Sequence, residues 1–214
     1  MLSAEQAVEL CEALEGARVR YWVMGGWGVD ALLGRETRSH KDLDILALID
    51  DLPQLRRLFG DNGFALSHVW EESQWTESAG ERWPTAFVAS DAIGREIDVH
   101  LIEILSDGLI LQHYDNPWSL PESFATTGTI DTKAVPCVSR AAQLKMHTGY
   151  VVPKEQELDL ERLQARGDGV ADTPPAALVE PDLSGDVSAV RFTIRSRGPG
   201  SDSPPASLQL RGGR

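Results

Sequence analysis

Cysteines, long apolar segments and basic residues are all scarce in this sequence. Its two cysteines, Cys11 and Cys137, stand 126 positions apart, which excludes a disulfide framework and favours two reduced thiols. No apolar run approaches the roughly 18 to 20 residues that a membrane-spanning helix needs, and the first residues do not resemble a signal peptide. We therefore expect a cytoplasmic protein without a membrane partner.

Acidic residues outnumber basic ones by 33 to 20, and the formal net charge is −13. Such a field repels nucleic-acid phosphates and attracts metal ions or amine-bearing substrates, so nucleic acid is not expected as a bulk partner. The acidity belongs to residues 1–166, which hold 27 acidic and 15 basic side chains. An acidic surface is also common in soluble proteins that have no such role.

The composition changes sharply near residue 167. From there to residue 214, Gly, Pro and Ser make up 19 of 48 residues, and Trp and Tyr are absent. A segment of this kind does not pack a core, so it is predicted to be a disordered tail.

The rest of the chain alternates between strand-like and helix-like patterns. Ser3 and Gln6 form a capping box at the start of the first helix. The patterns predict helices and strands in an α/β (α+β) order, a mixed sheet flanked by helices, with a small helical part after it. The expected strands are 21–24, 43–48, 64–70, 85–89 and 96–102, and the expected helices are 3–14, 27–33, 52–59, 139–150 and 154–166.

Carboxylates stand at alternate positions of two of these strands. In Asp42-Leu43-Asp44 the alternation puts both acids on one face, and Asp98 projects in the same way from the strand 96–102. Two carboxylates about 4 Å apart repel by roughly 4 kcal/mol at an effective dielectric near 20, so a site that keeps them ionised favours a bound cation. Mg²⁺ suits such oxygen ligands.

A glycine turn precedes the carboxylates. Gly25 and Gly26 lie between a strand and a helix, where backbone N–H groups can approach a triphosphate closely. A basic cluster then follows, and its cations suit the β and γ phosphates; it consists of Arg35, Arg38, His40 and Lys41. Each of these features is also explained by turn geometry or solvation alone, and it is their order along the chain that favours a functional site.

Other residues keep two interpretations. Glu103 is an alternative to Asp98 as general base, although a glutamate at a strand end is more often solvated. His100 either positions Asp98 or is structural, and His147 and Tyr150 suit either an acceptor pocket or packing at a helix end. The loop bounded by Trp70, Trp75 and Trp83 contains four glutamates, which fits an aminated sugar or, as we prefer, a solvated loop.

Residues 22–46 resemble the core of the polymerase-β-type nucleotidyltransferases, and more narrowly the antibiotic-modifying branch with the lincosamide nucleotidyltransferases and aminoglycoside-2''-adenylyltransferases. The similarity continues at Asp98-Val99-His100, at 128–130, at 135–139 and at 143–150, and it covers about residues 5–165. It implies a polymerase-β-like fold, with a catalytic core at 1–105, a substrate-side part at 106–166 and a tail at 167–214.

The resemblance also implies roles for single residues. Asp42, Asp44 and Asp98 would bind Mg²⁺ and act in catalysis, with Asp98 as a candidate proton acceptor. The nucleotide phosphates would be held by Gly25, Gly26, Arg38 and Lys41. Trp27 stands where the wider superfamily often has Ser, Lys41 stands where several relatives have an acidic residue, and the chain after about residue 166 does not match the family.

The function expected from this resemblance is Mg²⁺-dependent transfer of AMP from ATP to a hydroxyl of a lincosamide or aminoglycoside antibiotic, with release of pyrophosphate. The partners are then a nucleoside triphosphate and an antibiotic-like acceptor, and a homodimer is compatible with the sequence. Two alternatives stay open. One is a nucleotidyltransferase toxin of a toxin–antitoxin pair, and the other is a non-catalytic nucleotide-binding module on the same fold.

The tail composition leads to a first prediction. Removal of residues 167–214 is expected to leave Mg²⁺-dependent pyrophosphate release and the melting temperature unchanged, because such a segment adds little to a core. Calorimetry and a pyrophosphate assay on the shortened and full chains make the comparison. An insoluble or inactive product would contradict the prediction.

Overall fold

The computed structural model describes residues 1–105, 110–112, 119–120, 123–148 and 153–165. The predicted tail at 167–214, and Tyr150 at the end of a predicted helix, lie outside these residues. The described part contains five α-helices and a short 3-10 helix, at Ala4–Gly16 (α1), Gly25–Leu33 (α2), Ile49–Asp51 (η1), Leu52–Asp61 (α3), Arg140–Met146 (α4) and Lys154–Ala165 (α5). No helix within it is long and apolar enough to cross a membrane.

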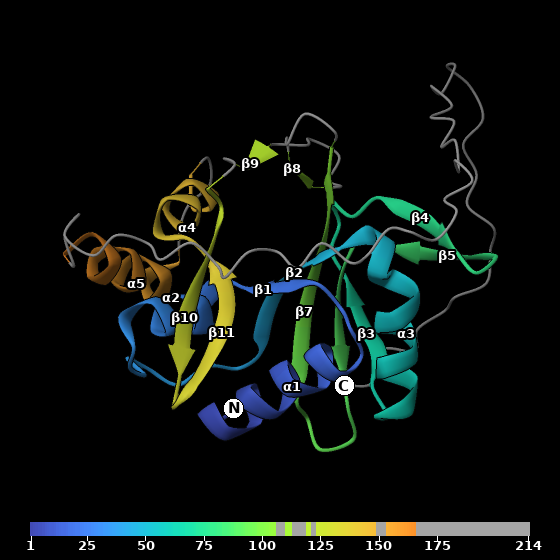
Figure 1. Ribbon diagram of the computed structural model, residues 1–214, viewed down its shortest axis with the longest axis horizontal. Coiled ribbons are helices and arrows are strands. Elements are labelled where there is room, and N and C mark those ends of the chain that lie inside the picture. Colours follow the sequence, from blue (N-terminus) through green and yellow to red (C-terminus); the bar gives the residue numbers. More distant parts are fainter. Residues whose placement is uncertain (106–109, 113–118, 121–122, 149–152, 166–214) are drawn as a thin grey trace, which may run out of the picture. The chain divides into compact units, whose positions relative to one another are not determined.

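A mixed sheet organises these helices (Figure 1), and its strands follow the order β10-β11-β1-β2-β7-β6-β3. β2 runs parallel to β7 and antiparallel to β1, while β1 also pairs in parallel with β11. In chain order, the strands of this sheet are Tyr21–Val23 (β1), Leu43–Leu48 (β2), Ala65–Val69 (β3), Ala86–Ser90 (β6), Glu96–Ile104 (β7), Ala125–Ile130 (β10) and Lys133–Val138 (β11). Short strands Ile110–Gln112 (β8) and Ser119–Leu120 (β9) extend it beside β7.

Each face of the sheet packs its own apolar core. Leu43, Ile45 and Ala47 of β2 join the larger core, which also contains side chains of α1 and α3. Leu46 and Leu48, on the opposite face of the same strand, join a smaller core that α4 completes. Asp44 has the same parity as the second pair, so it projects from the sheet face that carries the smaller core.

The first helix and the strand order of the N-terminal hundred residues confirm the sequence patterns. Ser3 and Gln6 form the expected capping box on α1. The two helices predicted after residue 138 are present as α4 and α5, and the structure adds two strands that the patterns did not predict, β10 and β11, which belong to the main sheet. The hairpin formed by Trp75–Ser78 (β4) and Glu81–Pro84 (β5) was also missed. It turns at two residues of positive φ, Ala79 and Gly80, and the first of them is not a glycine.

A close approach between β10 and α2 gives the second prediction. A Cβ added at Gly128 would lie 2.7 Å from the backbone carbonyl carbon of Ala31. Because the clash is with backbone, neither β10 nor α2 can shift to relieve it at low energetic cost. Gly128→Ala is expected to lower the free energy of unfolding by about 1 to 3 kcal/mol, as overpacking usually does. Urea denaturation measures it.

Gly60→Ala in α3 is the matched control. Nothing lies within 4 Å of a Cβ at that position, so the same change there should be neutral or stabilising. Equal effects of the two substitutions would show that the contact with α2 does not limit position 128.

Candidate active site

Two of the predicted carboxylates lie at the beginning of β2. Asp42 directly precedes the strand and Asp44 is its second residue, while Leu43 and Ile45 between and after them are fully buried. Both acids are half-buried. The period-two alternation therefore places the pair on one face, as the sequence predicts.

Asp98 comes to the same place from the neighbouring strand. In the parallel register of β2 and β7, the Cα of Asp44 is paired with that of Asp98. The Asp98 carboxyl is buried, and its Oδ1 accepts a hydrogen bond of 2.9 Å from the indole N–H of Trp70. All three aspartates line one cavity of about 1280 Å³.

The charges of these carboxylates act on one another. Burial raises the pKa of Asp44 well above its ordinary value of 3.8, and the negative charges of Asp42 and Asp98 raise it further, against the opposing effect of Arg38. Burial and then the charge of Asp98 also raise the pKa of Asp42. The site concentrates negative charge where little water screens it.

The chemistry of this donor set fits a hard divalent cation. Its ligands are carboxylate oxygens only, and a positive ion relieves their mutual repulsion. Within the described residues, no three His, Cys, Asp or Glu side chains already surround a common point at which a metal ion could sit. The aspartates therefore offer the right atoms, while their side chains would have to turn inward around an ion.

The glycine turn predicted between strand and helix is the first turn of α2, which begins at Gly25 and not at Trp27, and it lies directly beside the carboxylates. Gly25 begins α2 with a φ of +58°, and a Cβ on it would collide with the Asp44 carboxyl. A Cβ on Gly26 would collide with the His40 ring and lie 2.8 Å from Nη2 of Arg38. The first turn of α2 thus lines the cavity with no side chain of its own at Gly25 and Gly26, and no described side chain caps the N-terminus of the helix.

The loop before β2 is fixed to α2 by a buried carboxylate. Asp30 accepts hydrogen bonds from the backbone N–H and the hydroxyl of Thr37, and its Oδ2 lies 2.5 Å from Nε2 of His40. The Trp27 ring packs on the His40 ring with centroids 4.5 Å apart. Trp27 therefore supports this loop from within the core, where a serine would leave a gap.

The predicted cations of the loop, Arg38 and Lys41, both line the cavity, but each is paired with a carboxylate. Arg38 donates from Nε and Nη2 to Oδ2 of Asp159 in α5, at 3.0 and 2.7 Å. Lys41 Nζ lies 2.7 Å from Glu96, and its side chain is 69% exposed. A phosphate would have to compete with these carboxylates.

Some of the described residues with two interpretations line the cavity of the aspartates, and others do not. His100 and His147 line the cavity, and Nδ1 of His147 lies 2.8 Å from the Gln143 carbonyl oxygen. Asp98 lines this cavity, and Glu103 is not among the described residues that do. Of the tryptophan and glutamate loop, Trp70 and Glu72 are the members that line it.

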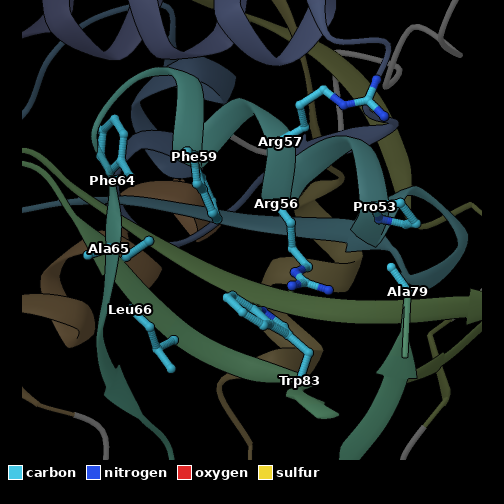
Figure 2. Close-up of a pocket in the computed structure, with 11 residues that line it drawn as sticks. Pro53, Arg56, Arg57, Phe59, Phe64, Ala65, Leu66, Ala79 and Trp83 are labelled. Atoms are coloured by element: carbon cyan, nitrogen blue, oxygen red, sulfur yellow. The ribbon is translucent and has the colours of Figure 1, made fainter. Parts of the chain in front are cut away.

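Trp83 lies in a different hollow, a cavity of about 440 Å³ between α3 and the β4–β5 hairpin (Figure 2). There the Arg56 guanidinium lies 4.5 Å from the centre of the Trp83 ring and donates to the Ser78 carbonyl oxygen at 2.7 Å. Trp75 is half-exposed and carries Arg82 over its ring. Both tryptophans lie on the β4–β5 hairpin and pack with arginines, and neither is among the described residues that line the cavity of the aspartates.

Sequence reasoning missed two residues of the cavity, Asp159 and Gln143, and it did not foresee the contact that Trp70 makes. Trp70 contacts Asp98, and Asp159 binds Arg38. Gln143 in α4 is fully buried, and neither polar atom of its amide has a hydrogen-bond partner among the described residues. A glutamine inside an apolar helix face was the one available signal for Gln143, and no sequence pattern indicates the ion pair of Asp159 or the bond from Trp70 to Asp98.

Comparison with known proteins identifies the family. A model described as aminoglycoside-2''-adenylyltransferase matches residues 6–163. The chain belongs to this family. It is accordingly a nucleotidyltransferase, as its sequence predicts.

Relatives of the family agree with this assignment. A lincosamide resistance protein of Staphylococcus haemolyticus is 29% identical over 164 residues, which are 73% of this chain and 91% of that protein. The lincomycin-bound lincosamide adenylyltransferase LnuA superposes with a TM-score of 0.64 at 23% identity, over 77% of this chain and 98% of its own. ANT(2'')-Ia in complex with adenylyl-2''-tobramycin superposes with a TM-score of 0.56 at 17% identity, over 76% and 90%. These likenesses confirm the predicted fold.

The raised pKa of Asp44 gives the third prediction. Between about pH 3.8 and the native pKa, the folded protein binds more protons than the unfolded chain, so stability falls as the pH rises through that window. At pH 7 the charge is destabilising, and Asp44→Asn is expected to raise the stability of the metal-free protein. Calorimetry in chelator should show a gain that shrinks as the pH is lowered toward 4.

Asp91→Asn is a control of opposite sign. Although burial opposes it, hydrogen bonds from Arg95 hold the pKa of Asp91 below 3.8. Neutralising this residue should destabilise the protein at pH 7. A loss of stability in both variants would contradict the account of Asp44.

Proposed function

We propose that this nucleotidyltransferase transfers a nucleoside monophosphate, AMP from ATP, to a hydroxyl of a lincosamide-like or aminoglycoside-like antibiotic, with Mg²⁺ as cofactor and pyrophosphate as the second product. The observation that carries the proposal is the pairing of Asp44 with Asp98 on parallel strands, next to Asp42 and to the glycine turn. The oxygen donors of the aspartates and the N–H groups of the turn suit a divalent cation and a triphosphate.

The nucleotide phosphates are assigned to the N-terminus of α2. Gly25 and Gly26 leave its first N–H groups open, and the helix dipole favours an anion there. Arg38 lies against Gly26 and supplies a charged donor if a phosphate displaces Asp159. Lys41, more exposed, would contact the outer end of the triphosphate.

The aspartates are assigned to the chemical step. Asp42, Asp44 and Asp98 would hold Mg²⁺, which would polarise the phosphoryl group and neutralise the leaving pyrophosphate when bound. Asp98 takes the proton of the acceptor hydroxyl, whose oxygen forms a bond to the α-phosphorus. The bond from that phosphorus to the oxygen bridging to the β-phosphate breaks, and the electron pair leaves with pyrophosphate.

The size of the cavity supports a reaction with two substrates. Small-molecule sites usually measure about 300 to 1,000 Å³, and this one, at about 1280 Å³, exceeds the range for a single ligand. Its lining runs from the glycine turn and Asp98 to α4 and α5. The relatives named for lincosamide resistance and for an adenylylated tobramycin support an antibiotic as the acceptor.

Because ATP is an intracellular metabolite, we assign the reaction to the cytoplasm.

The test is a panel of acceptors and nucleotides. The protein is incubated with lincosamides, aminoglycosides and a mixed RNA, each with ATP, GTP, CTP or UTP and Mg²⁺, and products are analysed by mass spectrometry for an added nucleotide. An AMP adduct on an antibiotic supports the proposal. Adducts on RNA alone favour the toxin alternative, and absence of any adduct favours the non-catalytic module.

Asp44→Asn provides the fourth prediction. The variant should lose Mg²⁺-dependent pyrophosphate release by at least about 100-fold, because an oxygen ligand and its charge are removed from the reacting centre. Asp131→Asn is the control, since this exposed turn residue has a φ of +53° that Asn also adopts and does not line the cavity among its described residues. Full activity in Asp44→Asn would overturn the assignment.

A further inference from the structure

Trp70 is fixed next to the reacting carboxylate by its backbone as well as by its ring. It directly follows β3, and its N–H donates to the Ala86 carbonyl oxygen at 3.2 Å while its own carbonyl oxygen accepts from Ser73 at 3.0 Å. Its ring packs edge-on against the His68 ring, with centroids 4.8 Å apart. The indole N–H that reaches Asp98 is therefore supplied by an anchored group.

The two contacts to the Asp98 carboxyl are made to the same oxygen. The Trp70 N–H donates to Oδ1 at 2.9 Å, and Nε2 of His100 lies 3.2 Å from that atom. Within the described part of the chain, Oδ2 of Asp98 accepts no hydrogen bond. One oxygen is thus held by the protein, and the other is left for a ligand.

We propose that Trp70 is a positioning residue, which holds Oδ1 of Asp98 so that Oδ2 is presented to the metal ion and to the acceptor hydroxyl. This inference rests on the proposed function, since it assigns the orientation of the proposed base. An indole N–H can only donate and does not titrate near neutral pH, so it binds one oxygen of the carboxylate in a single direction. Groups that orient a ligating carboxylate typically change metal affinity or activity by about 10-fold to 100-fold when removed.

The hydrogen bond from Trp70 to Asp98 also has a purely structural explanation, which is that it only satisfies a buried carboxylate. The two roles differ in what Trp70→Phe changes, because that variant keeps an aromatic ring and removes the N–H. A merely structural bond would lower the melting temperature and leave the folded protein with normal kinetics and metal affinity. A positioning bond lowers kcat and metal affinity in protein that remains folded.

The experiment compares Trp70→Phe with Trp75→Phe, which alters an indole that is 50% exposed and is not among the described residues lining the cavity. Melting temperature, Mn²⁺ affinity by electron paramagnetic resonance, and kcat and KM with ATP are measured for each. We expect Trp70→Phe to lower kcat by about 10-fold or more with KM little changed, and to weaken Mn²⁺ binding about 10-fold. Trp75→Phe should match the wild type in each.

The double variant Trp70→Phe/Asp98→Asn tests whether the effect of Trp70→Phe on metal binding acts through Asp98. In Asp98→Asn the carboxylate is gone, so adding Trp70→Phe should not weaken Mn²⁺ binding further. Normal kcat and normal Mn²⁺ affinity in folded Trp70→Phe, or an equal further loss in the Asp98→Asn background, would overturn the inference. Trp70→Tyr, which also lacks the indole N–H, replaces Trp70→Phe if that variant does not fold.

The result is separable from that of the proposed function. If the wild type transfers a nucleotide and Trp70→Phe does so equally well, the function stands and the positioning role is wrong. If the wild type transfers nothing, the proposed function fails. The Mn²⁺ titrations then decide whether the indole orients the carboxylate.

Discussion

The pairing of β2 with β7 is the constraint on which the rest of this molecule depends. It brings Asp44 and Asp98 side by side although 54 residues separate them, and it does so against the repulsion between their charges. Burial of Leu43, Ile45 and Ala47 on the other face keeps β2 in place. A slip by one residue would turn those side chains out of the core and the aspartates into it, so the same apolar contacts that hold the sheet also hold the charges together.

Local patterns were sufficient to predict that part of the site. A strand alternates its side chains with a period of two whatever surrounds it, so Asp42 and Asp44 could be placed on one face from sequence alone. The capping box of α1 and the glycine turn are similarly local. The convergence of Asp98 required one further assumption, that its strand lies next to β2, and the register of the two strands confirms it.

The features that could not be predicted depend on contacts between distant segments. Arg38 and Asp159 are 121 residues apart, and no pattern near either one indicates that they form an ion pair. The same applies to the bond from Trp70 to Asp98 and to the unpaired amide of Gln143. The places of β10 and β11 in the sheet depend on the pairing of the two strands with each other, on the pairing of β11 with β1 and on the contact of β10 with α2, and their own composition does not indicate these contacts.

The parallel pairing of β1 with β11 has a consequence for how the chain is made. β1 obtains β2 as a neighbour early in synthesis, but its other edge stays bare until residue 138 has left the ribosome. During that interval the nascent protein presents an open strand edge beside completed helices, which is the kind of surface that chaperones recognise and that misfolded chains share. Among the described strands, β10 and β11 are therefore the ones that cover this edge of β1 late in synthesis, and pairing with other chains at that edge is open until they are in place.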